Sequence, residues 1–201
     1  MTYRRKDAYY RRARAAGYRA RSAYKLAQLD SRFRLLRHGD VVVDLGAWPG
    51  GWLQVALEAV GPHGRVVGVD LVAVDPLPAL NLRLVSGDVR DPSTWRAVLE
   101  HLGRPADVVL SDLAPKLTGI RETDDARSSE LVAAVLEMLP TILRSGGNLL
   151  IKLFMGGPFD LAATELRRRF EEFRTTRPEA TRKASGEVYG VGRRYRGVPA
   201  S

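Results

Sequence analysis

One lysine lies inside an apolar run. Lys152 stands in Leu150-Ile151-Lys152-Leu153-Phe154, a pattern typical of a strand buried in a parallel sheet. An ammonium group buried without a partner is costly. A lysine at a strand end can instead extend its ammonium group to water, whereas a lysine held inside a site can take part in proton transfer. The run alone leaves both interpretations open.

Carboxylates follow three successive apolar runs, at Asp70, Asp88 and Asp112. In a parallel sheet, ligands bind beyond the carboxyl ends of the strands. A single acid there is more often a cap of a turn or helix, but three at successive strand ends favour one shared pocket. We expect Asp70 to accept hydrogen bonds from ribose hydroxyls and Asp88 to meet an adenine amino group. A net-negative pocket also suits a sulfonium cation.

A glycine-rich loop follows the first run, from Gly46 to Gly50-Gly51. Glycines let a backbone turn tightly and approach a ligand closely. The dinucleotide fingerprint G-x-G-x-x-G needs a second glycine where this loop has Trp48. An indole there would block a pyrophosphate, which argues against NAD or FAD. The loop better suits a nucleoside without phosphates, such as S-adenosylmethionine.

The elements that must position these residues alternate along the chain. We expect strands at 41–46, 65–71, 82–88, 107–112, 148–154, 173–177 and 187–192, and helices at 6–29 (broken or kinked at Gly17), 52–60, 92–102, 124–143 (with Thr123 or Asp124 as N-cap) and 158–170. Alternating strands and helices predict an α/β fold. In it, a doubly wound, mostly parallel seven-stranded sheet carries helices on both faces.

Charge is distributed unevenly. Residues 1–25 hold nine Lys/Arg and one acid, residues 167–201 hold ten and four, and the segment between them is net acidic, within a chain of net charge +9. Basic ends can simply keep a chain soluble. They also suit an anionic polymer gripped by the termini. We expect residues 1–24 to be a basic, helical, RNA-binding arm, and 25–201 to form a single domain.

Composition excludes several classes of site. The chain has no cysteine and only three histidines, so disulfides and thiolate chemistry are excluded and we expect no metal site. The basic N-terminus lacks the apolar stretch of a secretory signal. No apolar run reaches the length needed to span a bilayer. We expect a cytoplasmic protein that binds no membrane.

Eight short motifs together resemble the FtsJ/RrmJ-type ribosomal RNA 2′-O-ribose methyltransferases, in order and spacing, from about residue 17 to 192. They are Arg21-Ser22-Ala23-Tyr24-Lys25-Leu26, Val43-Asp44-Leu45-Gly46, Pro49-Gly50-Gly51-Trp52, Gly68-Val69-Asp70-Leu71, Gly87-Asp88, Ser111-Asp112-Leu113-Ala114-Pro115, Lys152-Leu153-Phe154 and Ser185-Gly186-Glu187-Val188-Tyr189. Trp48 and Lys116 depart from the family pattern, in which a small residue and Asn are common.

The resemblance implies a Rossmann-like S-adenosylmethionine-dependent methyltransferase fold and assigns roles to residues. It implies a catalytic tetrad of Lys25, Asp112, Lys152 and Glu187. We expect Lys152 to be the base, Asp112 to orient it and touch the cofactor, and Lys25 and Glu187 to position the ribose. The expected cofactor contacts are Gly46, Gly50, Trp52, Asp70, Asp88 and Asp112.

The implied substrate is a ribose 2′-hydroxyl, most consistent with a uridine of 23S large-subunit ribosomal RNA, presented within a ribosomal particle to a monomeric enzyme that does not act on DNA. The absence of cysteine and of an Asn/Asp-Pro-Pro-aromatic loop argues against base methylation. Two alternatives stay open. The same chemistry could act on tRNA or another ribosomal site, or the chain could be an RNA-binding ribosome-assembly factor without catalysis.

Overall fold

The computed structural model describes residues 8–116, 118–156, 159–181 and 185–197. Strands and helices alternate through them. The strands are β1 Val41–Leu45, β2 Arg65–Asp70, β3 Leu82–Ser86, β4 Ala106–Ser111, β5 Leu143–Phe154, β6 Phe170–Thr176 and β7 Glu187–Tyr195. The helices are α1 Ala8–Ala15, α2 Ala23–Phe33, α3 Gly51–Val60, α4 Pro92–Leu102, α5 Arg121–Ile142 and α6 Phe159–Arg169.

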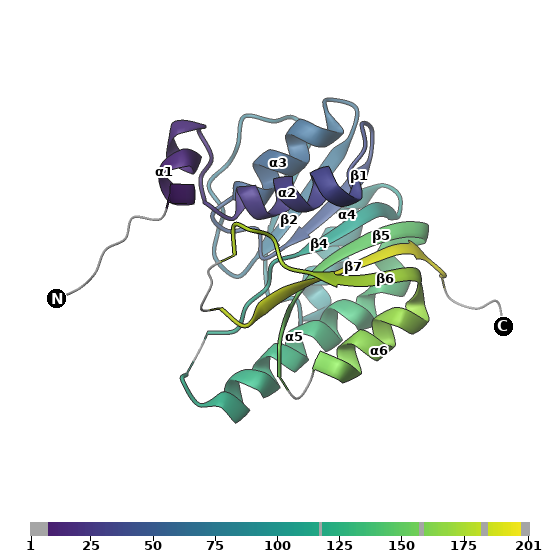
Figure 1. The fold of residues 1–201 in the computed structure, drawn as a ribbon. Coiled ribbons are helices and arrows are strands. Elements are labelled where there is room, and N and C mark those ends of the chain that lie inside the picture. Colours follow the sequence, from purple (N-terminus) through teal and green to yellow (C-terminus); the bar gives the residue numbers. More distant parts are fainter. Residues whose placement is uncertain (1–7, 117, 157–158, 182–184, 198–201) are drawn as a thin grey trace.

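The strands form one sheet in the order β3-β2-β1-β4-β5-β7-β6. Neighbours from β3 to β5 are parallel, whereas β7 lies antiparallel between β5 and β6. The strand order reverses direction between β1 and β4, next to the middle of the sheet (Figure 1). The predicted doubly wound, mostly parallel sheet of seven strands is confirmed.

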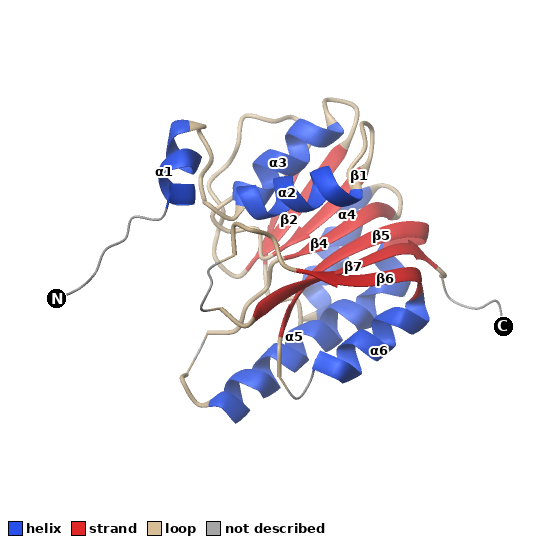
Figure 2. Cartoon of the chain, in the orientation of Figure 1, coloured by secondary structure: helices blue, strands red, loops and turns tan. Residues whose placement is uncertain are grey.

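Helices cover both faces of the sheet, which explains why β1 is apolar at nearly every position and buried throughout. Val43 and Leu45 belong to the core shared with α4, α5 and α6, and Val42 to the core shared with α2 and α3. Figure 2 shows α2 and α3 together on one side of the sheet, opposite α5 and α6. None of the described helices is long and apolar enough to cross a membrane.

The N-terminal helical segment divides at Gly17, as predicted. This residue has a φ of +76°, in the left-handed region that favours glycine, and it separates α1 from α2. Ala23 and Leu26 of α2 are fully buried in the core. The boundary expected between residues 24 and 25 therefore lies inside a core helix. Helix α1 lies away from the sheet (Figure 1) and packs against α2, with the ring of Tyr9 next to that of Tyr24. Residues 1–7 of the expected arm lie outside the described residues.

The N-cap predicted for α5 is wrong. The helix begins at Arg121, after Ile120 in an extended conformation. The carboxylate of Asp124 accepts the main-chain N–H groups of Thr118 and Gly119, at 2.7 and 3.1 Å. Asp124 therefore fixes the loop that leads into the helix and lies within its first turn, rather than ahead of it.

Two glycines fix how β7 pairs with β6. A Cβ on Gly192 would lie 2.7 Å from the ring of Phe170, and one on Gly190 would lie 2.9 Å from the ring of Phe173. Each ring therefore packs where the neighbouring strand has no side chain. Because a one-residue slip would move every side chain of a strand to the opposite face, these contacts help to specify the register.

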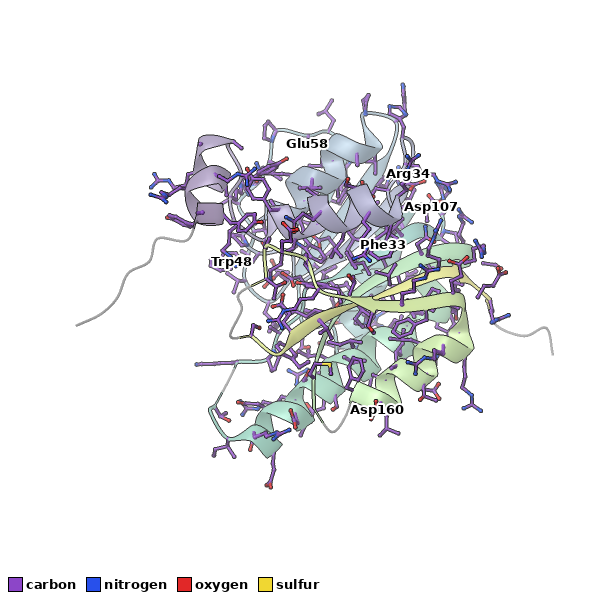
Figure 3. The ribbon with its side chains drawn as sticks, viewed as in Figure 1. Phe33, Arg34, Trp48, Glu58, Asp107 and Asp160 are labelled. Carbon is purple, nitrogen blue, oxygen red and sulfur yellow. The ribbon has the colours of Figure 1, made fainter. Side chains whose placement is uncertain are left out.

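Asp107 ties the strands together at the amino end of the sheet. Its carboxylate accepts the Val41 N–H at 2.8 Å and lies 2.6 Å from nitrogen atoms of both Arg104 and Arg144. Burial alone would raise the pKa of this carboxyl, but the hydrogen bonds from Arg104, Val41 and Arg144 outweigh it and lower the pKa. Figure 3 shows Asp107 far from Trp48, which marks the opposite end of the sheet.

We expect Asp107→Ala to lower the free energy of unfolding by about 2–4 kcal/mol, because it leaves a buried N–H and two guanidinium groups without their acceptor. A lowered pKa stabilises the fold above the carboxyl's unfolded-state pKa, and this contribution is lost as pH falls through the folded value. Urea unfolding should therefore show a difference from wild type that shrinks in acid. Exposed Glu137 gives the matched control, Glu137→Ala; equal effects of the two substitutions would contradict the role of Asp107.

Candidate active site

The residues predicted to bind a cofactor follow neighbouring strand ends. Leu45 of β1 pairs with Val69 of β2 and with Ser111 of β4, so the loops after these strands leave the sheet at the same level. This is the edge beside the reversal of strand order, where ligands bind in open α/β sheets.

A cavity of about 640 Å³ opens at this edge. Four of the predicted cofactor residues line it: Gly46, Asp70, Asp88 and Asp112. The other lining residues come from the same loops and from α5, namely Trp48, Leu71, Gly87, Val89, Arg90, Leu113, Ala114, Pro115, Lys116, Arg127, Glu130 and Leu131. The structure thus brings three carboxylates from successive strand ends to one cavity, as the sequence predicts.

The loop after β1 needs glycine at its first position. Gly46 has a φ of +84°, and a Cβ there would lie 3.1 Å from the main-chain nitrogen of Leu113. A side chain at this position would therefore crowd the contact between the loops after β1 and β4. Further along the loop, the N–H of Trp48 donates to Asp70 at 2.9 Å, which joins it to the end of β2.

Gly50 and Trp52 do not line the cavity wall. Gly50 is buried beneath the side chain of Arg19, and Trp52 is 2% exposed, with its indole N–H donating to the main-chain oxygen of Ser22 at 2.8 Å. Both residues belong to the start of α3, where the first turn of a helix presents unpaired N–H groups that suit an anion such as a carboxylate. Their contact with a cofactor stays a prediction, and it would be made through the main chain.

The carboxylates around the cavity differ in their partners. Asp88 accepts hydrogen bonds from two guanidinium nitrogens of Arg90, which lower the pKa of Asp88 and favour its charged form. Asp44 is fully buried at the end of β1, and neither of its oxygens has a hydrogen-bond partner among the described residues. Burial, together with the charges of Asp112 and Asp70, raises the pKa of Asp44 well above its usual value. The surroundings of Asp44 therefore favour its neutral, protonated form.

The predicted tetrad forms two ion pairs beside this cavity. Lys152 donates to the main-chain oxygen and to Oδ1 of Asp112, both at 2.9 Å. Lys25 of α2 donates to Oε1 of Glu187 at 2.6 Å. All four side chains are at most 16% exposed. Lys152 is therefore a buried, paired lysine and not one that extends to water at a strand end.

Tyr189 joins the two ion pairs and was missed by the sequence analysis. Its hydroxyl donates to Oδ1 of Asp112 at 2.6 Å, and Lys25 donates to the same hydroxyl at 3.4 Å. It stands opposite Lys152 in the pairing of β5 with β7, two residues along β7 from Glu187 and on the same face. This spacing was visible in the sequence, but it could be read only once the pairing of β7 with β5 was known.

The arrangement can hold a hydroxyl and move its proton. Two amines and two carboxylates, linked by one phenol, surround the end of β4, where Asp112 also lines the cavity. Such a set of coupled groups suits general acid–base chemistry on a weakly acidic group. Among the described residues there is no group of three His, Cys, Asp or Glu side chains arranged to hold a metal ion.

The strand order, with an antiparallel β7 next to the edge, and a carboxylate-lined cavity at the switch point define a Rossmann-like methyltransferase. The model of the FtsJ-like methyltransferases matches residues 18–195, and the chain belongs to that family.

Known proteins agree with this assignment. The chain is 48% identical over 194 residues to the ribosomal RNA large subunit methyltransferase E of Methanothermobacter thermautotrophicus, covering 96% of this chain and 92% of that protein. A putative ribosomal RNA methyltransferase of Plasmodium falciparum has a similar structure, with a TM-score of 0.79 and 27% identity, over 90% of this chain and all of that one. Aeropyrum pernix fibrillarin, solved with bound S-adenosylmethionine, shares the fold alone, with a TM-score of 0.60 and 19% identity, over 85% of this chain and 76% of that one.

We expect Tyr189→Phe to lower the free energy of unfolding by about 1.5–3 kcal/mol, because it removes a buried hydrogen bond to a carboxylate. Burial, then Asp112 and Glu187, raise the pKa of Tyr189 well above its usual value. A raised pKa stabilises the fold below the unfolded-state pKa, and this contribution is lost as pH rises through the folded value.

Denaturant unfolding should therefore give a constant difference between wild type and Tyr189→Phe from pH 6 to 9 that narrows above about pH 10. Tyr10 is 44% exposed, so Tyr10→Phe is the control and should change little. A loss for Tyr189→Phe no larger than that of the control would contradict the bridging role of the hydroxyl.

Proposed function

We propose that this protein methylates a ribose 2′-hydroxyl of large-subunit ribosomal RNA, with S-adenosylmethionine as the methyl donor. One observation carries the proposal: the ion pairs Lys152–Asp112 and Lys25–Glu187 lie beside a cavity that carboxylates line. The hydroxyl of Tyr189 connects the two pairs. Membership of the FtsJ-like family and relatives named for large-subunit ribosomal RNA support it. A uridine of 23S rRNA, a ribosomal particle as substrate, a monomeric enzyme and cytoplasmic location are parts of the same proposal.

The polar groups at the cavity suit this cofactor. Asp70 would accept the ribose hydroxyls, Asp88 the adenine amino group, and the start of α3, at Gly50 and Trp52, the carboxylate of the methionine part. The carboxylates of Asp70 and Asp112, which line the cavity, match the positive charge of the cofactor. When bound, the cofactor supplies an electrophilic methyl group on a positively charged sulfur.

The tetrad would act on the RNA hydroxyl. Lys152, in its neutral amine form, would accept the proton of the RNA 2′-hydroxyl that takes up the methyl group. Asp112 holds the Lys152 amine through two hydrogen bonds, and Lys25 with Glu187 would hold the ribose. Holding the two reactants in line is the largest contribution that we assign, since effective molarities can supply roughly 7–11 kcal/mol.

The basic helix α1 supports an RNA-binding role for the arm. The ring of Tyr24, the residue before Lys25, lies 5.7 Å from the ring of Tyr9 and 5.3 Å from the guanidinium carbon of Arg12. Residues of α1 thus pack on the segment that carries a tetrad lysine. Arg11 and Arg14 of α1 are exposed and could contact phosphates leading to the site.

The test is incubation of the protein with labelled S-adenosylmethionine and ribosomal large subunits, free rRNA or tRNA, followed by mass spectrometry of digested RNA. We expect a methylated ribose in large-subunit rRNA. A methylated base, or efficient methylation of tRNA with none of large subunits, would overturn the assignment. Binding to subunits without any transfer would favour an RNA-binding assembly factor.

We expect Lys152→Ala to reduce single-turnover methyl transfer by at least about 10²–10⁴-fold while S-adenosylmethionine binding stays within a few-fold of wild type. Lys152→Arg should fail too, because a guanidinium does not release its proton at working pH. Rapid-quench transfer assays and calorimetry measure the two quantities, and circular dichroism checks the fold. Near-normal transfer in either variant would remove Lys152 as the base.

We expect deletion of residues 1–16, which hold six Lys/Arg, to weaken RNA binding and flatten its dependence on salt. Each phosphate contact that is lost lowers the slope of log affinity against log salt by about 0.7–0.9. Cofactor affinity, measured by calorimetry, is the internal control and should not change. An unchanged slope would move the RNA surface elsewhere, for instance to Arg167–Arg169 and Arg193–Arg196.

A further inference from the structure

Trp48 leaves most of a large apolar side chain in water beside the cavity. It is 56% exposed, although it lines the cavity together with Gly46 and Asp70. In Figure 3 it lies at the same end of the sheet as the strand ends that carry the site. An indole left in this position is available to cover whatever fills the cavity next to it.

The carboxylate of Asp70 is bonded to the main chain of exposed apolar residues at this side of the cavity. Oδ2 of Asp70 accepts the N–H of Trp48, and Oδ1 accepts the N–H of Val72, both at 2.9 Å. Leu71 and Val72 are 69% and 54% exposed. A carboxylate has about four acceptor positions, so each oxygen of Asp70 keeps one for a ligand. A diol bound to Asp70 would therefore share the cavity with Trp48 and Leu71, which also line it.

The backbone of Trp48 is fixed while its indole is exposed. Arg19 donates to the main-chain oxygen of Pro49 at 3.4 Å and also to those of Asp75 and Pro76, which joins the loop after β1 to the chain after β2. Ala47 accepts the N–H of Gly50 within the same loop. Loop movement is thus restrained at both ends, and covering a ligand needs only a change of side-chain rotamer.

We propose that the indole of Trp48 covers the nucleoside half of bound S-adenosylmethionine and adds to its affinity. The inference rests on the cofactor site proposed above. The position of Trp48 in the sheet favours the cofactor, rather than the target nucleotide, as the group that the indole covers. Trp48 and Asp70 follow β1 and β2, whereas Lys152 and Glu187, which would hold the target ribose, lie on β5 and β7. Strand β4 lies between the two sets of strands.

The first experiment is acrylamide quenching of tryptophan fluorescence. The other two tryptophans, Trp52 and Trp95, are 2% and 4% exposed, so quenching of the wild-type protein reports mainly on Trp48, and Trp48→Phe gives the background. We expect saturating 5′-methylthioadenosine, which carries the nucleoside without the amino-acid part, to protect Trp48 as well as S-adenosylmethionine does. Methionine alone should not protect it.

The second experiment measures affinity for 5′-methylthioadenosine by calorimetry. Loss of an aromatic face should weaken binding by roughly 3- to 15-fold in Trp48→Ala, and Trp48→Phe should recover most of it. Leu80 is 98% exposed and lines a different pocket, at the amino end of the sheet. Leu80→Ala is therefore the matched control and should bind as wild type does.

The outcomes separate this inference from the cofactor site itself. A Trp48 that stays fully open to quencher while calorimetry shows the cofactor bound would overturn the role of Trp48 and leave the site intact. Protection by RNA but not by 5′-methylthioadenosine would overturn it in favour of stacking on a base. If wild type binds neither S-adenosylmethionine nor 5′-methylthioadenosine, both the site and the cover fail.

Discussion

The carboxylate of Asp112 connects the two halves of the site. Asp112 follows β4 at the point where the strand order reverses. Its side chain lines the cavity on one side and contacts Lys152 on the other. One of its oxygens receives both the ammonium of Lys152 and the hydroxyl of Tyr189. A shift of this one carboxylate would therefore change the proposed base and the proposed cofactor pocket together.

The carboxyl groups around the cavity have different partners. Asp88 is compensated by Arg90 and Asp112 by Lys152, whereas Asp44 is buried without a hydrogen-bond partner among the described residues. Burial, with the charges of Asp112 and Asp70, raises the pKa of Asp44 well above its usual value, so the protein favours the neutral form of this carboxyl. The negative charge that faces the cavity therefore comes from Asp70, Asp88 and Asp112, which line it.

Most of the fold could be predicted from the sequence. Strands buried on both faces appear as continuous apolar runs, and the segments between these runs have the length and pattern of helices. The carboxylates at strand ends could be predicted for the same reason, since parallel strands bring their ends together. The pairing of Lys25 with Glu187 could not, because 162 residues separate them and only the family resemblance linked them. Tyr189 was missed because, within an alternating strand, it reads as one more core position. The start of α5 was misplaced because Asp124 bonds backward to its own loop.

The glycines of β7 accommodate side chains of the neighbouring strands. Phe170 and Phe173 fit over glycines of β7, and a strand shifted by one residue would present Val191 or Arg193 to them instead. On the other side of β7, the pairing with β5 sets Tyr189 opposite Lys152 and Glu187 opposite Phe154. A Cβ on Gly190 would also lie 3.2 Å from the side chain of Ile151 of β5, so this glycine accommodates side chains from both neighbouring strands. A single insertion between Glu187 and Gly192 would therefore turn Glu187 to the opposite face of the strand, away from Lys25.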